Sequence, residues 1–349
     1  MEKSILFLKE FALFIKSSKT GRRRMPSGKK ITKGTLTQYQ CVRNLIRDFE
    51  CNQKCVLRIV PLKRSSARLI QKEKFYWKNT IKSLLQYLYR DRGCYDNYVS
   101  GVLKVIKSFF RYIEIEKSIY VGAFYKAFRV PSDVFDPITL TPDQLRFLIC
   151  DRLFENSLTG SLKNIKDIFV FGCTVGLRFG DLMKLKQTNL QKINEQYILI
   201  ANTQKTGVQI RINLPNYAIE ILKRHRKNSK KYLLPRISNT NFNIQVKNLA
   251  RKAGWDYYSP KIRHKLGKPI EIKTGKNETY RFYHHITAHS MRRTAITSLL
   301  MLGLEEHIVR RISGHAPGSK EFYRYVSISQ DYLNDKLKDA YQRLVEDRI

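Results

Sequence analysis

The chain has few acidic residues for its size. Its 349 residues include 29 Asp and Glu against 66 Lys and Arg, which gives a formal net charge of +37. So large an excess is unusual for an enzyme of small molecules. A polyanion is the natural partner, because each neutralised phosphate releases condensed counterions. Charge alone leaves open a ribosomal protein or a protein with a merely basic surface.

Cysteine and histidine are sparse where a metal site would need them. Six cysteines are scattered along the chain, only Cys51 and Cys55 lie close together, and no histidine precedes His225. This pair of cysteines lacks a second pair of metal ligands. We therefore expect free thiols in a reducing cytoplasm and no bound metal.

Long apolar runs are also missing. No stretch of about 18 uninterrupted apolar residues occurs, so no segment is expected to span a membrane. Lys9 and Glu10 interrupt the apolar N-terminus, and no small-residue cleavage site follows, which argues against a signal peptide. A cytoplasmic, nucleoid-associated protein is the expectation.

The length exceeds the usual size of one hydrophobic core, and 42% hydrophobic residues can fill two. Residues 1–34 predict an N-terminal helix and a basic arm. The helix is expected over 5–16 with one apolar stripe, made of Ile5, Leu8, Ala12 and Ile15. The arm, 19–34, contains no acid, so it either follows a DNA backbone or is a solvated linker. Its candidate DNA contacts are Arg22, Arg23, Arg24, Lys29, Lys30 and Lys33.

The remaining chain divides at a proline-rich segment. From 35 to 129, apolar residues recur three and four apart, which predicts an all-helical domain of about four helices. Three prolines in 130–142 mark a linker. Residues 143–328 predict a mixed, mostly helical domain with a small β-hairpin or sheet, and 329–349 a last amphipathic helix. The expected fold class is mainly α.

Two β-hairpins are expected inside the second domain. β-Branched runs at 197–200 and 208–212 flank a short turn, which puts Lys205 near the tip of the first hairpin. A second strand pair is predicted around 268–283, with 274–277 as its turn.

The densest cluster of polar side chains lies near the C-terminus. His289 and Arg292 stand three residues apart where apolar residues repeat at helical spacing, so both should leave one face of one helix. A histidine N–H and a guanidinium on one face suit a phosphate, because the planar fork of arginine matches two oxygens. His315 follows a glycine after a further apolar helix, and Tyr323 and Tyr325 come next.

An earlier turn completes the pattern. The sequence Gly-Leu-Arg-Phe-Gly-Asp at 176–181 contains Arg178 and Asp181, and Lys205 follows on the expected hairpin. The set GLRxxD, hairpin lysine, HxxR, GH and tyrosine, in this order, resembles the tyrosine recombinases, which include phage and mobile-element integrases and Xer-type resolvases. Each motif alone is weak, whereas the ordered set is specific.

The resemblance implies DNA strand exchange through a 3′-phosphotyrosyl intermediate, without metal, ATP or another cofactor. Four side chains would hold the scissile phosphate: Arg178, His289, Arg292 and His315. Lys205 would be the general acid for the leaving 5′-oxygen, and Asp181 would orient Arg178.

The resemblance also assigns partners. Residues 35–129 would be a core-binding domain that clamps double-stranded DNA, and 143–328 the catalytic domain. In the family, four protomers assemble on two recombination sites, and a terminal helix often docks on a neighbouring protomer. For 329–349, packing in cis remains an alternative.

Two tyrosines compete for the role of nucleophile. Tyr323 follows His315 by eight residues and Tyr325 by ten, and the usual spacing of the family lies between these values. The context Phe-Tyr-Arg-Tyr-Val at 322–326 matches the family pattern F-x-x-Y-V and favours Tyr325. Tyr323 remains the alternative.

Other functions stay open at this point. A basic DNA-binding protein without catalysis, acting as an architectural factor, would share the charge but not need every catalytic position. A type IB topoisomerase shares the Arg, Lys, His and Tyr chemistry and relaxes supercoils without a specific site. Within the recombinases, the extra basic N-terminal segment favours an integrase of a phage or other mobile element over an invertase or a dimer resolvase.

Overall fold

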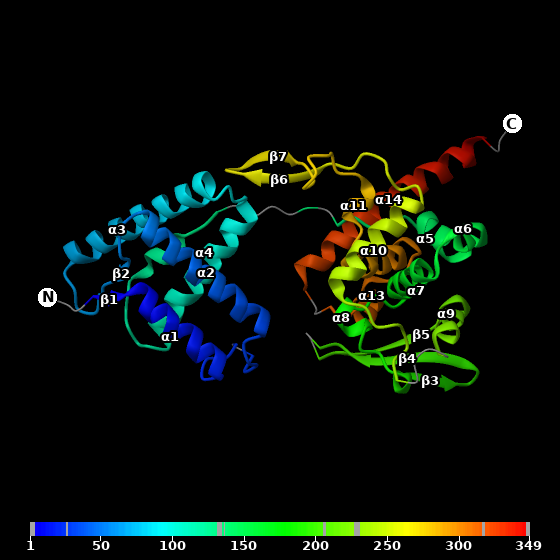
Figure 1. Cartoon of the computed structure of the whole chain (residues 1–349), viewed down its shortest axis with the longest axis horizontal. Coiled ribbons are helices and arrows are strands. Elements are labelled where there is room, and N and C mark those ends of the chain that lie inside the picture. Colours follow the sequence, from blue (N-terminus) through cyan, green and yellow to red (C-terminus); the bar gives the residue numbers. More distant parts are fainter. Residues whose placement is uncertain are drawn as a thin grey trace. The chain divides into compact units, whose positions relative to one another are not determined.

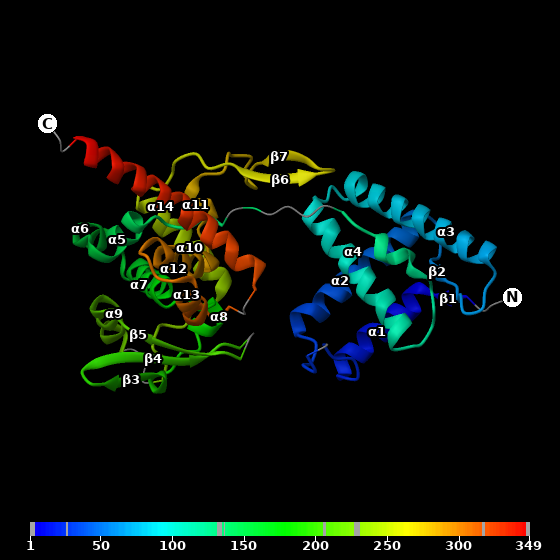
Figure 2. The ribbon, with the colours of Figure 1, turned by 180° about the vertical axis from the view of Figure 1, so that it is seen from behind.

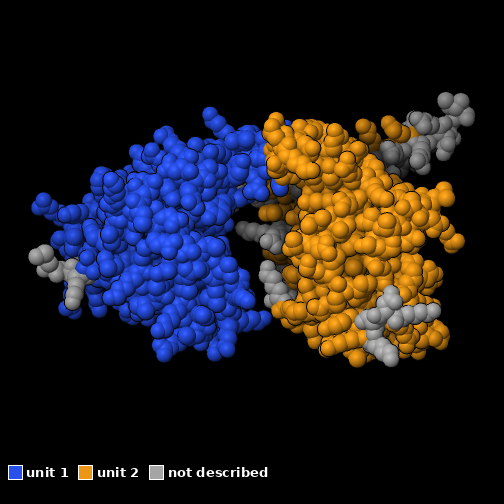
Figure 3. Space-filling view, in the orientation of Figure 1, with its two compact units in different colours: residues 1–134, 261–272 blue, residues 135–260, 273–349 orange. Residues whose placement is uncertain are grey.

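The computed structural model describes residues 4–25, 27–130, 135, 137–204, 207–226, 231–315 and 318–346, apart from several side chains in the last helix. The chain forms two compact units, coloured separately in Figure 3. Unit 1 comprises Met1–Val134 and Lys261–Ile272, and unit 2 comprises Phe135–Pro260 and Lys273–Ile349. The first change of unit therefore lies inside the expected linker.

Unit 1 is a helical body (Figure 1), and its core is rich in aromatic residues. Its elements are β1 (Ile5–Leu6), α1 (Phe7–Thr20), α2 (Lys33–Asn52), β2 (Arg58–Ile59), α3 (Ala67–Gln86), a π-helical turn (Tyr87–Asp91), α4 (Asp96–Ile115), a 3-10 turn (Ala123–Ala127), β6 (Lys261–Lys265) and β7 (Lys268–Ile272). Thr32 and Ser66 begin α2 and α3, because each hydroxyl accepts a backbone N–H of the first turn.

The buried face of α1 differs from the predicted stripe. Phe7, Phe11 and Phe14 are buried, with Phe109 of α4 4.7 Å from Phe11 between ring centroids, whereas the four predicted residues are only partly buried. The predicted residues Ile5, Leu8 and Ile15 do pack against this core, but the phenylalanines beside them are the fully buried positions. Burying phenylalanine rings removes more apolar surface from water. Helix α1 is thus part of the core of unit 1.

The β6–β7 hairpin lies earlier in the chain than predicted. Its strands pair antiparallel around a turn at Leu266 and Gly267, both with positive φ (55° and 77°). The predicted turn at 274–277 is a separate hydrogen-bonded turn. The buried carboxylate of Asp96, at the start of α4, accepts the backbone N–H groups of Leu266 and Gly267, both at 2.9 Å. These two bonds hold the hairpin turn on α4.

Unit 2 is mostly helical, with one small sheet along one side (Figures 1 and 2). Its elements are α5 (Pro142–Cys150), α6 (Arg152–Ser157), α7 (Gly160–Val175), α8 (Phe179–Leu182), β3 (Leu190–Ile193), β4 (Gln196–Asn202), β5 (Gln209–Asn213), α9 (Asn216–Arg226), α10 (Asn239–Lys252), α11 (Phe282–His285), α12 (Ala288–Met301), α13 (Glu306–Ser313) and α14 (Lys320–Glu346). The predicted mainly α fold class is confirmed.

The sheet contains the expected first hairpin. Strands β3, β4 and β5 are antiparallel in the order β3-β4-β5, and Asn202 pairs with Gln209 where the β4–β5 pair meets its connecting loop. The sequence analysis did not predict β3.

Helix α12 is the central element of unit 2. Most of its residues are buried, and it packs closely on α7, where a Cβ added at Gly172 would lie 2.4 Å from the sulfur of Met291. Helix α14 begins at Lys320, nine residues before the predicted start at 329, so both candidate tyrosines lie on a helix. No helix within the described ranges is long and apolar enough to cross a lipid bilayer.

Candidate functional site

Arg178 is placed by the end of α7. Gly176 adopts a left-handed conformation (φ 63°), which ends the helix and which side chains with a Cβ rarely adopt. Leu177 then enters the core, and Arg178 begins α8. The Nη1 atom of Arg178 is buried and has no hydrogen-bond partner among the described residues. A buried unpaired guanidinium N–H is costly, and this atom lacks the oxygen acceptor that would offset its burial.

The first turn of α12 carries His289 and Arg292, as predicted. Asn243 of α10 accepts the N–H of Ala288 through Oδ1 at 2.7 Å and so fixes the start of the helix. His289 is exposed, while Arg292 is 2% exposed and donates from Nη1 to the carbonyl of Gly176 at 2.9 Å. Arg292 therefore joins α12 to the turn that bears Arg178.

His315 follows the end of α13. Gly314 is left-handed (φ 64°), and His315 then lies beside Arg292, whose Nη2 is 3.1 Å from Nε2. The hydroxyl of Ser313 lies 2.8 Å from Nδ1 of His315 and donates its own proton to the carbonyl of Val309 at 2.7 Å. Nη2 of Arg292 also lies 3.2 Å from Nδ1, so its guanidinium faces both ring nitrogens of His315.

The other cations of the site act on His315. Its pKa is lowered from 6.5 to about 3, first by burial and then by the charges of Arg292, Arg178, Arg310 and His289. Arg178, His289, Arg292 and His315 therefore form one cationic cluster, drawn from three separate segments, and Arg310 of α13 adds its charge from beside it. An anion is the ligand that such a cluster binds best.

The lowered pKa of His315 predicts acid sensitivity. Between pH 6.5 and about 3 the unfolded chain binds a proton that the folded site excludes, so stability falls as the pH drops through this range. Between pH 7 and pH 5 we expect the free energy of unfolding to fall by roughly 1 kcal/mol more in wild type than in His315→Gln, after allowing for solvent screening. Calorimetric unfolding of both chains across this range measures the difference. Parallel pH profiles would contradict the assignment.

The two candidate tyrosines have different environments. Tyr325 is 7% exposed, and its ring centroid lies 6.1 Å from that of His315. Tyr323 is 53% exposed and lies against Arg310, whose Cζ is 4.8 Å from its ring centroid. Tyr325 is thus the tyrosine whose ring lies next to His315, whereas Tyr323 lies against Arg310 of α13.

Lys205 lies outside the described residues, but the residue before it is held from two sides. Asp181 accepts the backbone N–H of Gln204 at 3.3 Å, and Lys184 donates from Nζ to Oε1 of Gln204 at 2.8 Å. The expected role of Asp181 was to orient Arg178. The described hydrogen bond of its carboxylate connects the segment after Arg178 to the residue that follows β4 and Thr203.

The basic arm contains one arginine that differs from the others. Arg23 pairs from Nε with Glu116 at 3.1 Å, donates to Ser108 and stacks on Phe14 at 4.7 Å, so its guanidinium is engaged within unit 1. The other five candidate DNA contacts of the arm are exposed. The contacts of Arg23 favour a structural role, and the spacing of basic residues gave no signal of this difference.

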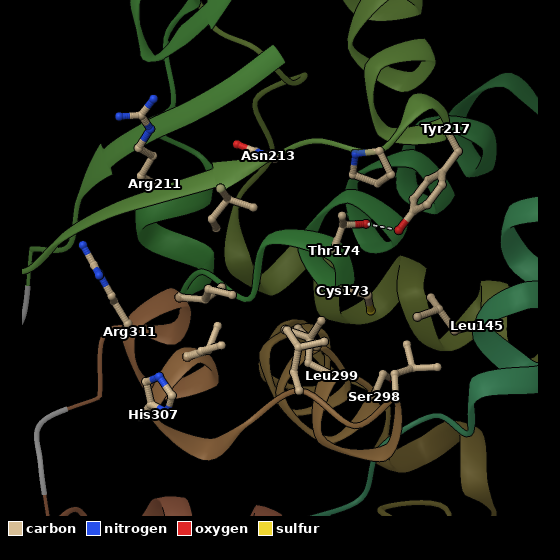
Figure 4. Close-up of a pocket in the computed structure, with 17 residues that line it drawn as sticks. Leu145, Cys173, Thr174, Arg211, Asn213, Tyr217, Ser298, Leu299, His307 and Arg311 are labelled. Carbon is tan, nitrogen blue, oxygen red and sulfur yellow. Dashed lines mark hydrogen bonds between the residues drawn. The ribbon is translucent and has the colours of Figure 1, made fainter. Parts of the chain in front are cut away.

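A second surface feature of unit 2 is a cavity of about 650 Å³ between β5, α12 and α13 (Figure 4). Leu299 and Ser298 of α12 line it, together with Arg311 and His307 of α13, while the hydroxyl of Tyr217 lies 3.0 Å from that of Thr174 at its edge. The face of α13 that lines this cavity differs from the face that carries Val309 and Ser313.

The sequence analysis missed Asn243 and Ser313, which contact the start of α12 and His315. Ser313 is two residues before His315, so a hydroxyl next to the Gly-His pair was a usable signal. Asn243 lies 45 residues before Ala288, and no local pattern indicates the contact. Among the described residues, no group of His, Cys, Asp or Glu has the arrangement of a metal site.

The cationic cluster lies within the mostly helical unit 2. The chain belongs to the phage integrase family, which matches residues 140–331 and thus includes the whole cluster. The resemblance to tyrosine recombinases inferred from the motifs is confirmed. No curated protein matches the chain.

Solved integrase structures share the fold. A lambda integrase dimer bound to a COC′ core site has a TM-score of 0.55 and 14% identity, covering 92% of this chain and 95% of that chain. A Tn1549 transposon integrase in complex with transposon right end DNA has a TM-score of 0.56 and 15% identity, covering 98% of this chain and 100% of that chain. A lambda integrase tetramer bound to a Holliday junction has a TM-score of 0.56 and 16% identity, covering 93% of this chain and 78% of that chain.

Proposed function

We propose that the chain is a site-specific recombinase that cleaves and rejoins double-stranded DNA, acting as the integrase of a phage or other mobile element. The observation that supports this most directly is the unpaired Nη1 of Arg178 within a cluster of cations. A phosphodiester supplies the oxygens that this donor lacks. The transition state of its cleavage gathers negative charge where the guanidinium groups lie.

The proposed reaction is two balanced transesterifications. The hydroxyl oxygen of Tyr325 attacks phosphorus, the bond to the 5′-oxygen breaks, and the chain carries a 3′-phosphotyrosyl ester. His289 takes the proton of the tyrosine, and Lys205 protonates the departing 5′-oxygen. The 5′-hydroxyl of a partner strand then attacks the ester and releases Tyr325. The number of phosphoester bonds is conserved, so the reaction needs no ATP.

The neutral state of His315 gives it a defined part in this reaction. Nη2 of Arg292 lies 3.2 Å from Nδ1 and 3.1 Å from Nε2, so the neutral ring accepts a hydrogen bond from Arg292. Binding of an anion near Nε2 favours protonation there, so His315 takes up a proton as the phosphate enters. It then donates to a phosphate oxygen together with Arg292.

The exposed cations of the arm are the proposed contacts to the DNA backbone. Replacing Arg22, Arg24, Lys29, Lys30 and Lys33 with alanine is expected to reduce the slope of log affinity against log salt by up to about 4, since each phosphate contact contributes about 0.9. Titration of one duplex at several salt concentrations measures this slope. Exchanging Arg for Lys and Lys for Arg at these five positions keeps the charge and should leave the slope unchanged. An unchanged slope in the alanine variant would contradict the proposal.

Assembly into a homotetramer on two DNA sites is the proposed working state. Helix α14 exposes Leu337 (51%) and Tyr341 (67%), and the cavity between β5, α12 and α13 offers an apolar surface of suitable size in a second copy. Sedimentation on a synthetic four-way junction tests this assembly. A wild-type chain that binds the junction only as a monomer would disprove it, and Leu337→Asp is expected to lower the assembled fraction.

Covalent trapping tests the proposed function. The full chain is incubated with nicked duplexes cut from the DNA that flanks its coding sequence, so that the cleaved fragment diffuses away. We expect a denaturation-resistant adduct, sensitive to a phosphotyrosyl phosphodiesterase. No adduct on duplexes that the chain binds would favour a non-catalytic DNA-binding protein. Relaxation of unrelated supercoiled plasmids would favour a topoisomerase.

A further inference from the structure

Arg310 of α13 lies between two aromatic rings of α14. Its Cζ is 4.5 Å from the ring centroid of Phe322 and 4.8 Å from that of Tyr323. Its Nη2 pairs with Oε2 of Glu306, one turn earlier on α13, at 3.1 Å. The side chain is 15% exposed. A planar guanidinium that meets two rings and one carboxylate is held in a single orientation.

The backbone of Arg310 contacts the second histidine of the site. Its carbonyl accepts the N–H of His315 at 3.0 Å, just after Gly314 ends the helix. One residue therefore contacts His315 through its main chain and the start of α14 through its side chain.

The rings that Arg310 contacts lie two and three residues before Tyr325. Phe322 is fully buried, packs in one cluster with Ile296, Leu300, Val309 and Tyr325, and lies 5.4 Å from the ring of His315. Tyr323 is largely exposed, so burial does not explain its position. The interaction with Tyr323, followed by the pairing with Glu306, raises the pKa of Arg310.

We propose that Arg310 is a positioning residue for strand cleavage, and that Tyr323 is its partner and not a nucleophile. By holding the first turn of α14 on α13, the Arg310–Tyr323 pair sets the distance between Tyr325 and the cationic cluster that would hold the phosphate. This inference rests on the proposed recombinase function. Neither group touches the reacting atoms. The role depends on the stacking of the planar guanidinium of Arg310 on the ring of Tyr323.

Single-turnover cleavage at saturating DNA tests the proposal in the full chain. Arg310→Lys keeps the charge but loses the planar stack, and Tyr323→Ala loses the ring. We expect each to slow adduct formation by about 10-fold or more while the dissociation constant for DNA stays within about twofold, because a small displacement of a reacting group is costly. Tyr323→Phe keeps the ring and should stay within about threefold of wild type.

The double variant separates positioning from general damage. If Arg310 and Tyr323 act as one unit, combining Arg310→Lys with Tyr323→Ala slows cleavage no more than the slower single variant. Arg236→Lys is the matched control, because Arg236 stacks at 4.6 Å on Tyr232 and has no assigned role. Its cleavage rate should match wild type.

The outcomes are distinguishable from failure of the proposed function. Wild type that forms adduct while Arg310→Lys and Tyr323→Ala cleave equally fast would overturn this inference alone. Additive effects in the double variant, or slowing matched by weaker DNA binding and a lower melting temperature, would also overturn it. Wild type that forms no adduct on bound DNA would overturn both proposals.

Discussion

Replacing Tyr325 with phenylalanine is expected to abolish the covalent protein–DNA adduct, whereas Tyr323→Phe retains it. The hydroxyl oxygen is the attacking atom, and phenylalanine keeps the ring that packs against Phe322 and His315. The loss should therefore exceed about 1,000-fold in cleavage rate with unchanged DNA binding, as for removal of a nucleophile. Denaturing gels of the trapped adduct, with mass spectrometry of the labelled peptide, measure both variants.

Tyr323→Phe is the matched control, since it removes the same atom two residues away. Loss of the adduct with Tyr323→Phe but not with Tyr325→Phe would reverse the assignment. The structure argues against that outcome, because Tyr323 is 53% exposed and engaged with Arg310, while Tyr325 lies next to His315.

Features set by neighbouring residues were predicted from the sequence. His289 and Arg292 share α12 because the helical period fixes the relation of residues three apart. Gly176 and Gly314 both end helices in the left-handed conformation, and each precedes a site residue closely. The order of the motifs was therefore enough to indicate both the family and the residues that form the cluster.

Features that depend on packing between distant segments were not predictable. Helix α1 has one broad apolar face, and its packing against the phenylalanines of α4 decides which residues of that face are fully buried. The sequence does not distinguish Arg23 from the other basic residues of the arm, because its contacts with Glu116 and Phe14 are seen only in the structure. Composition identifies such residues but does not assign their partners.

Long-range hydrogen bonds were missed for the same reason. Asp96 caps a hairpin turn 170 residues away, and Asp181 contacts the backbone of Gln204, 23 residues later. In both cases a carboxylate meets a backbone N–H group, which every residue but proline carries. The type of acceptor is visible in the sequence, while the donor is not.

The second large effect is expected for Arg292→Lys. The guanidinium of Arg292 donates to the carbonyl of Gly176 at 2.9 Å and to Nε2 of His315 at 3.1 Å from two different nitrogens. A lysine keeps the charge but has one nitrogen, so it cannot hold this geometry and also meet two phosphate oxygens. Removing one such donor from a transition state typically costs about 100-fold to 1,000-fold in rate. We expect that loss in single-turnover cleavage, with DNA affinity nearly unchanged.

Two comparisons test whether this loss of cleavage rate comes from the contact of Arg292 with the phosphate. Arg293→Lys alters the next residue of α12 and should cleave within a few-fold of wild type. Arg292→Ala leaves a cavity at a side chain that is 2% exposed, and added guanidinium ion should restore part of its activity. Rescue by guanidinium but not by ammonium would show that the fork itself is required. If Arg292→Lys instead cleaves within about tenfold of wild type, Arg292 serves mainly to join α12 to Gly176, and the phosphate depends on Arg178.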